Sequence, residues 1–175
     1  MIVIETKRLR LREYTKDDFD ELKKVISDPE TMKYYEKPYD DAGVNRWLNW
    51  CINSYAQNGF GLWAIELKET GQFIGDCGLS LQNIDNEILP EIGYHINKKY
   101  WRNGYAKEAG IAVKEWAFKN TKYTKLYSYM TKDNTPSYST AMSIGLKFIK
   151  EYNDEGIPHL VYMIEKEVNE WYNIK

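Results

Sequence analysis

The residues with the clearest chemical signal form one run in the second half of the chain. Residues 91–109 read as a strand, a basic turn whose glycine is Gly104, and a helix that begins with small residues. The start of a helix leaves backbone N–H groups without partners and carries partial positive charge, which suits a phosphate. Gly104 would let the backbone approach such an anion closely, while Arg102 and Lys107 would add charge at its rim. The alternative is an ordinary capped helix whose basic residues are solvated.

Two common phosphate-binding patterns do not fit this run. No Gly-Lys-Ser/Thr follows the turn, so the Walker pattern is absent. Gly104, Ala106 and Ala109 give a relaxed version of the dinucleotide-binding fingerprint, which also requires an acidic residue about twenty positions later. Residues 123–126 contain no carboxylate. The sequence therefore argues against a Rossmann site.

The elements that must position this run are read from hydrophobic periodicity and turn residues. Thr15 and Asp18 form a capping-box-like start for a helix that ends at Asp28-Pro29, and Thr70-Gly71 is typical of a hairpin turn. Further helices are predicted at 41–57, 104–118 and 136–144, and strands at 6–14, 60–67, 73–81, 89–96, 126–130, 147–152 and 159–165. One helix joins the strands at 89–96 and 126–130. The fold class predicted is a mixed α/β sheet with a single βαβ crossover.

The composition narrows the class of protein. The 175 residues carry a net charge of -2, which argues against a nucleic-acid partner, and no linker-like stretch divides them. We therefore expect one domain over residues 1–175. The two cysteines, Cys51 and Cys77, are expected to be packing residues rather than a disulfide or metal ligands, and no metal site is expected. The first residues turn charged too early for a signal peptide, and no apolar run is long enough to cross a bilayer, so no membrane partner and a cytoplasmic location are expected.

The run at 91–109, followed by Asn-Thr-Pro-Ser at 134–137 and by residues 143–148, resembles the GNAT acetyltransferase superfamily. The closer resemblance is to its Rim-type branch, which includes the ribosomal-protein N-terminal acetyltransferases. Residues 91–94, 101–109 and 134–137 match that branch position for position, and residues 5–12 look like its first strand. Trp101 is usual in the branch, whereas Leu146 replaces the usual phenylalanine. Ala141 stands where the wider superfamily often has a tyrosine general acid.

The resemblance implies a twisted, mostly antiparallel sheet whose strands 91–96 and 126–130 splay apart to admit the pantetheine arm of acetyl-CoA. Backbone groups of Tyr94, His95 and Ile96 would hold that arm on one side, and Asn134 and Ser137 would contact it from the other. The pyrophosphate would lie on the turn formed by Trp101, Arg102, Asn103, Gly104, Tyr105, Ala106 and Lys107.

The resemblance also implies direct attack of a substrate amine on the thioester, without a covalent enzyme intermediate. An amine must be neutral to attack, and at pH 7 a lysine-like amine is almost entirely protonated. Glu91 is the candidate general base, the alternative being a structural strand-end carboxylate. Ser137 or Tyr138 would protonate the thiolate, or else only cap a helix.

The sequence leaves the roles of several residues, and of the chain itself, undecided. His95 faces away from Tyr94, and a structural role is favoured for its side chain over a catalytic one. The pairs Tyr34-Tyr35 and Trp47/Trp50 line an acceptor pocket or close the core. The chain is read as an N-acetyltransferase for a small-molecule amine or a protein N-terminus, acting as a monomer or a homodimer. The alternative is a non-catalytic acyl-CoA-binding module, for which Ala141 gives a basis.

Overall fold

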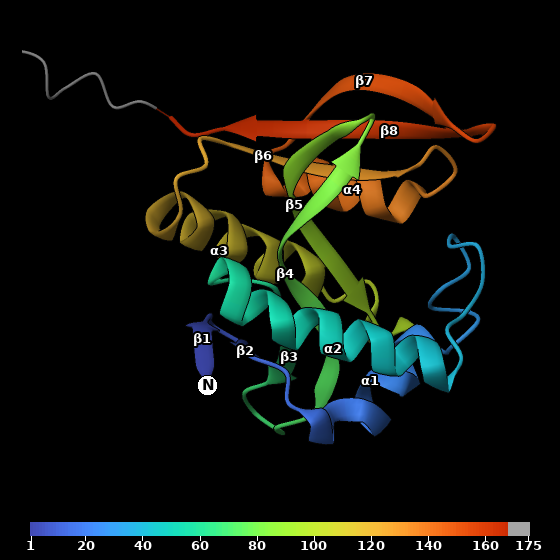
Figure 1. The fold of residues 1–175 in the computed structure, drawn as a ribbon. Coiled ribbons are helices and arrows are strands. Elements are labelled where there is room, and N and C mark those ends of the chain that lie inside the picture. The colour runs from blue at the N-terminus through green and yellow to red at the C-terminus, as the bar shows by residue number, and fades with distance from the viewer. Residues whose placement is uncertain (168–175) are drawn as a thin grey trace, which may run out of the picture.

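The computed structural model describes residues 1–167, which form an eight-stranded sheet with helices on both faces (Figure 1). The domain expected over residues 1–175 therefore runs past the described part at 168–175. The helices are α1 (Phe19–Ile26), α2 (Asp41–Asn58), α3 (Tyr105–Asn120) and α4 (Thr135–Ile144), with short 3-10 turns η1 (Lys16–Asp18) and η2 (Lys98–Tyr100). The strands are β1 (Ile2–Glu5), β2 (Leu9–Arg12), β3 (Leu62–Leu67), β4 (Phe73–Ile84), β5 (Glu87–Ile96), β6 (Lys125–Thr131), β7 (Lys147–Asp154) and β8 (Ile157–Glu165).

The sheet has the order β1-β2-β3-β4-β5-β6-β8-β7, and only β5 and β6 run parallel. Helix α3 connects these two strands, so the predicted βαβ crossover is confirmed. Strand β4 pairs with β5 continuously from Gly75 to Ile84. In contrast, β5 and β6 share one register pair, Glu91 opposite Tyr127, and then diverge. The splayed central strands that the resemblance implied are present.

The two faces of the sheet carry separate hydrophobic cores. Helices α1 and α2 bury Leu22, Val25 and Leu48 on one face. Helices α3 and α4 bury Val113 and Ile144 on the other. Because side chains alternate along a strand, β5 contributes to both layers.

The first turns of α3 depend on small residues. Ala109 is fully buried, and a Cβ added to Gly110 would lie 2.2 Å from Cδ1 of Ile144. Gly110 therefore lets α3 approach Ile144, the last residue of α4.

The strand expected at 6–14 is present but shorter, as β2, because residues 6–8 form the turn from β1, a strand that was not predicted. The turn is closed locally: the Thr6 N–H donates to the Leu9 carbonyl, and the Leu9 N–H donates to Thr6 Oγ1, both at 3.0 Å. A threonine hydroxyl can replace a backbone partner in this way, which the alternation of leucines does not reveal. Leu9 and Leu11 do fill the core, as that alternation predicted.

The hairpin between β4 and β5 is longer than the predicted strands 73–81 and 89–96. Its turn is Asp85-Asn86, whose φ angles of +51° and +67° are both left-handed. Asp and Asn tolerate this conformation, and two such residues form the tight turn that suits the twist of a hairpin.

The remaining predicted elements are confirmed, with ends that differ by a few residues. At the start of η1, Asp18 accepts a hydrogen bond from the Thr15 N–H at 2.7 Å, as the capping-box pattern predicted. Cys51 and Cys77 are free and buried, as expected for packing residues. Within residues 1–167, no helix combines the length and apolar character needed to cross a bilayer.

Candidate active site

The turn predicted to bind an anion lies between β5 and α3. Arg102 and Gly104 both have left-handed φ angles, +62° and +77°. Gly104 is the N-cap of α3, and within the described chain no side chain caps this helix start. Arg102, Gly104 and Lys107 are exposed. The first N–H groups of α3 therefore stand at an open, electropositive helix end, a setting that suits a phosphate.

The side chains of Trp101 and Asn103 stabilise the turn by hydrogen-bonding to nearby backbone carbonyls. The indole Nε1 of Trp101 donates to the Ile96 carbonyl at 2.6 Å, which pins the turn to the end of β5. The amide of Asn103 donates to the carbonyls of Tyr100 and Trp101, each at 3.0 Å. These contacts fix the backbone whose N–H groups face outward.

Contacts made by Arg8, in the N-terminal hairpin, also hold the turn in place. They were not predicted from the sequence. Arg8 Nε donates to Glu108 at 2.7 Å, Arg8 Nη1 donates to the Asn103 carbonyl at 3.0 Å, and the guanidinium lies 4.5 Å from the Tyr105 ring centre. Burial opposes the charge of Glu108, but hydrogen bonds from Thr6 and Arg8 outweigh it and lower the pKa of Glu108. Arg8 and Glu108 are a hundred positions apart, so no local sequence pattern predicts this ion pair.

The predicted pantetheine contacts meet on the α3–α4 side of the gap between β5 and β6. The Tyr94 hydroxyl donates to the Ser137 carbonyl at 2.7 Å, and Ser137 Oγ lies 3.5 Å from that hydroxyl. The buried Asn134 caps α4 by accepting from the Ser137 N–H at 3.2 Å. The structure thus joins β5 to the start of α4 through these three residues.

The other candidate proton donor, Tyr138, has different neighbours. Its hydroxyl donates to Thr135 Oγ1 at 3.2 Å, and its ring stacks on Tyr162 of β8 with ring centres 6.3 Å apart. Ser137 is therefore the α4 residue that the structure brings to Tyr94. Ala141 is fully buried, so this position of α4 belongs to the core.

Glu91 and His95 lie on the opposite face of β5, toward α2. Ser80 of β4 donates to Glu91 Oε2 at 3.2 Å, and His95 Nδ1 lies 2.8 Å from Asp76 Oδ1. Burial raises the pKa of Glu91 to about 7, although the charge of His95 and the Ser80 hydrogen bond act in the other direction. A carboxyl that titrates near neutral pH is suited to general-base work.

Sequence reasoning missed Asp76 and Ser80, although a signal was present. Ser80 is paired with Glu91, and Asp76 with His95, across the β4–β5 hairpin. Within each pair, the two residues are the same number of positions from the turn at Asp85-Asn86. A sequence prediction that placed the turn at Asp85-Asn86 would have given the register of the hairpin, and with it both residue pairs.

Aromatic side chains flank His95. The rings of Trp47 and Tyr35 lie 5.0 Å and 5.5 Å from its ring, centre to centre. Tyr35 is 43% exposed and Trp50 is 38% exposed, so neither is a core residue. The Nε1 of Trp47 is buried and hydrogen-bonds to no group among residues 1–167. Tyr35 and Trp47 therefore border His95, and of these two rings Tyr35 is the exposed one.

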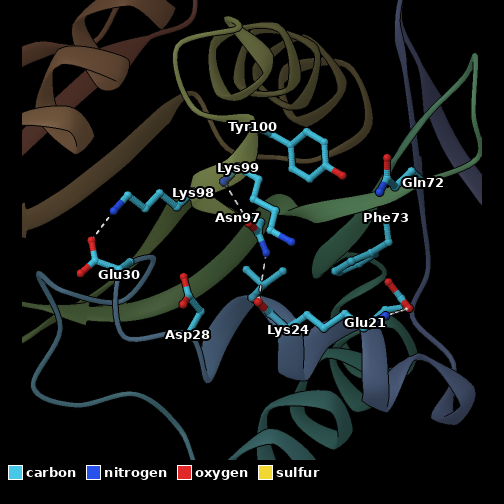
Figure 2. A pocket seen from close by; sticks show the side chains of 11 residues that line it. Glu21, Lys24, Asp28, Glu30, Gln72, Phe73, Asn97, Lys98, Lys99 and Tyr100 are labelled. Carbon is cyan, nitrogen blue, oxygen red and sulfur yellow. Dashed lines mark hydrogen bonds and ion pairs between the residues drawn. The ribbon is translucent and has the colours of Figure 1, made fainter.

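A cavity of about 790 Å³ lies between α1 and the segment that leads into the turn (Figure 2). Two of its three lysines are already ion-paired, Lys98 with Glu30 and Lys24 with Glu21. Residues 101–107 do not line it, so this hollow adjoins the turn without covering the helix start. Its walls are Glu21, Lys24, Val25, Asp28, Glu30, Gln72, Phe73, Asn97, Lys98, Lys99 and Tyr100.

Comparison with known proteins decides the family. Residues 8–147 match the family model described as an acetyltransferase (GNAT) domain. The chain belongs to the GNAT acetyltransferase family. Among similar proteins, the uncharacterized protein YkkB of Bacillus subtilis is 34% identical over 79% of this chain and 80% of its own. The uncharacterized N-acetyltransferase p20 of Bacillus licheniformis is 32% identical over 86% of this chain and 84% of its own.

Solved GNAT structures agree with the fold. An acetyltransferase from Agrobacterium tumefaciens has a TM-score of 0.82 at 26% identity, covering 95% of both chains. RimL, a ribosomal L7/L12 alpha-N-protein acetyltransferase solved with coenzyme A, has a TM-score of 0.77 at 13% identity, covering 95% of this chain and 98% of its own. At that identity RimL shows the fold alone. The GNAT fold and the Rim-type neighbours predicted from the sequence are confirmed.

Proposed function

We propose that this chain transfers an acetyl group from acetyl-CoA to a primary amine, on a small molecule or a protein N-terminus, by direct attack on the thioester. The observation that carries the proposal is the gap between β5 and β6 beside the uncapped start of α3, in a chain of the GNAT family. We further propose that residues 1–175 act as one domain, as a monomer or homodimer. Two free, buried cysteines favour the cytoplasm.

The residues present suit acetyl-CoA, which supplies the acetyl thioester. The N–H groups of the Arg102–Lys107 turn would hold the pyrophosphate, with the two end residues adding positive charge. Backbone groups of Tyr94, His95 and Ile96 would hold the pantetheine arm along the unpaired part of β5. Asn134 and Ser137 would close the other side of the gap.

The proton chemistry falls to residues on both faces of β5. Glu91 would take a proton from the amine, and its raised pKa of about 7 makes it a usable base near neutral pH. Backbone N–H groups near Tyr94 would stabilise the charge that develops on the carbonyl oxygen. Ser137 or Tyr138 would pass a proton to the thiolate.

The test is thiol release from acetyl-CoA in the presence of N-terminal peptides, polyamines and aminoglycosides, with products identified by mass spectrometry. We expect release above the hydrolysis background for at least one class of amine. A second candidate function, a non-catalytic acyl-CoA-binding module, is favoured by the buried Ala141 in place of a tyrosine acid. Calorimetric CoA binding without acceptor-dependent thiol release would support the module and overturn the enzyme.

A further inference from the structure

A hydrogen-bonded line of three side chains runs beneath the α2 face of the sheet. Asp76 is fully buried and uses both carboxylate oxygens: Oδ2 accepts from the Tyr14 hydroxyl at 3.0 Å, and Oδ1 lies 2.8 Å from His95 Nδ1. A carboxylate can only accept, so it holds the imidazole with the proton on Nδ1. The lone pair of the neutral ring is then on Nε2, which hydrogen-bonds to no residue of the described chain.

The surroundings of His95 suit a substrate ammonium. Glu91 lies four positions before His95 on the same face of β5, and its charge adds to that of Asp76 in raising the pKa of His95. The other groups facing His95 are the rings of Tyr35, from the segment between α1 and α2, and Trp47 of α2. Trp47 also offers a buried Nε1 donor that has no partner among residues 1–167. Negative charge flanked by aromatic faces favours an organic cation.

We propose that His95, oriented by Asp76, accepts the proton that converts the substrate ammonium into the neutral amine, and that Glu91 accepts a second proton as the amide forms. This assignment rests on the proposed acetyl transfer. An ammonium must lose two protons to become an amide nitrogen, and the site holds two bases on one face. His95 is thus a catalytic residue, and Asp76 is a positioning residue.

The protons and electrons balance as follows. The ammonium gives one proton to His95 Nε2, and the freed lone pair forms the C–N bond at the thioester carbonyl carbon. The C–S bond breaks with its electron pair on sulfur, and the nitrogen gives its second proton to Glu91. Sulfur gains one proton from solvent through the hydroxyls of α4. When His95 and Glu91 release their protons, one proton has left per turnover.

The pKa shifts of His95 and Glu91 support this assignment of one proton to each base. Burial opposes the charge of His95, but the Asp76 carboxylate outweighs it and raises the pKa of His95 above its ordinary value. Burial raises the pKa of Glu91 to about 7. Glu91 therefore exchanges protons near neutral pH, and the Asp76 carboxylate makes His95 a stronger base than a free imidazole.

The experiment uses two probes, a primary alkylamine that the enzyme accepts and its trifluoromethyl analogue, whose nitrogen is already neutral at pH 7. For His95→Gln we expect a loss in kcat of about 100-fold on the alkylamine at pH 7 and less than about threefold on the analogue. The first loss should shrink as the pH approaches the pKa of the alkylamine. CoA affinity, measured by calorimetry, should not change. Glu91→Gln should be impaired on both probes, because the second proton must leave in either case.

Asp76→Asn provides a second variant in case His95→Gln folds poorly. Asn can donate to Nδ1, which moves the ring proton to Nε2 and removes the base, so the same loss on the alkylamine is expected. Nitrogen-15 NMR of the ring should report the changed tautomer. His159→Gln, at the other histidine of the chain, is the matched control and should behave as wild type.

The outcomes separate the two claims. A wild-type protein that acetylates no amine overturns the proposed function, and this inference with it. A wild-type protein that turns over while His95→Gln is unchanged, or loses the same factor on both probes at every pH, overturns the role of His95 alone. An Asp76→Asn variant with an unchanged tautomer and unchanged kcat overturns the role of Asp76.

Discussion

The Glu91 carboxyl combines a functional advantage with a cost in stability. It lies partly buried on β5 with a single hydrogen bond from Ser80, and burial raises its pKa to about 7. A carboxyl in that state can alternate between proton acceptor and proton donor at the pH of the cell. The same burial disfavours its charged form in the folded protein.

Replacing Glu91 with Gln should lower turnover by about 10²–10⁴-fold, because the base is lost. CoA affinity should stay intact, because the Arg102–Lys107 turn proposed to hold the pyrophosphate is unchanged. The acid limb of the pH–rate profile near pH 7 should flatten. Steady-state thiol release across pH 5 to 9 measures this, with Glu87→Gln at the exposed start of the same strand as control. An unaltered profile would remove Glu91 as a base.

The same variant should gain stability at high pH. A carboxyl whose folded pKa is raised stabilises the fold below its ordinary pKa of 4.5 and loses that contribution as pH rises through about 7. Glu91→Gln should therefore match wild type near pH 4 and exceed it above pH 7 by about 1–3 kcal/mol. Urea unfolding at pH 4.5, 6 and 8 checks the trend. A constant difference across this range contradicts the buried, titrating carboxyl.

At the scale of elements, the turn before α3 is held in place from the N-terminal hairpin. Arg8→Ala removes the contacts to Glu108 and the Asn103 carbonyl and should weaken CoA binding by about 3–10-fold, since an exposed ion pair is worth about 1 kcal/mol. Arg10→Ala is the matched control, because Arg10 is similarly exposed and pairs with Glu5, outside the turn. Calorimetry at two salt concentrations measures both. Equal affinities for the two variants would show that the Arg8 contacts do not support the turn.

Gly104→Val tests the turn itself. Valine is strained at a φ of +77°, and its branched side chain would stand where a phosphate must approach, so CoA binding should fall below detection. Gly59→Val is the control, because Gly59 at the end of α2 has a φ of +75° with open space around it. Both variants should lose about 1–2 kcal/mol of stability. Retained CoA affinity in Gly104→Val, measured by calorimetry, would show that the Arg102–Lys107 turn does not hold the pyrophosphate.

The hairpin of β4 and β5 shows where the sequence stops being informative. Periodicity and turn residues located both strands, and the resemblance pointed to Glu91. The partners of Glu91 and His95 depend on the register, which Asp85 and Asn86 set by adopting left-handed conformations. A strand predicted as 73–81 leaves that register open, so Ser80 and Asp76 could not be assigned.

At the scale of the whole molecule, the helix start at Gly104 was predictable because its signals lie within residues 91–109. The βαβ crossover was predictable because its strand, helix and strand follow one another along the chain. The Arg8–Glu108 pair was not, because it joins segments a hundred positions apart. The same holds for Tyr94 and Ser137, which are 43 positions apart and belong to different elements. Local patterns define elements, whereas contacts between elements require the packed fold.

Binding of CoA should stabilise the entire fold, since the ligand binds the folded chain and not the unfolded one. At a CoA concentration of about 100 times Kd the gain is about 2.7 kcal/mol, which for a chain of this size corresponds to a rise in Tm of about 5–10 °C. Scanning calorimetry measures it, with Gly104→Val as the control that should show no rise. A wild-type Tm that does not respond to CoA contradicts the proposed site.

The single register pair between β5 and β6 divides the sheet into two parts. Five strands lie on one side of Glu91 and Tyr127 and three on the other, and α3 is the connection that spans them. A change in the angle between the two parts would widen or narrow the gap without breaking any other ladder. Glu91 lies at the pivot, where such a rotation displaces a residue least. The proposed base would therefore keep its place while the walls of the gap move around it.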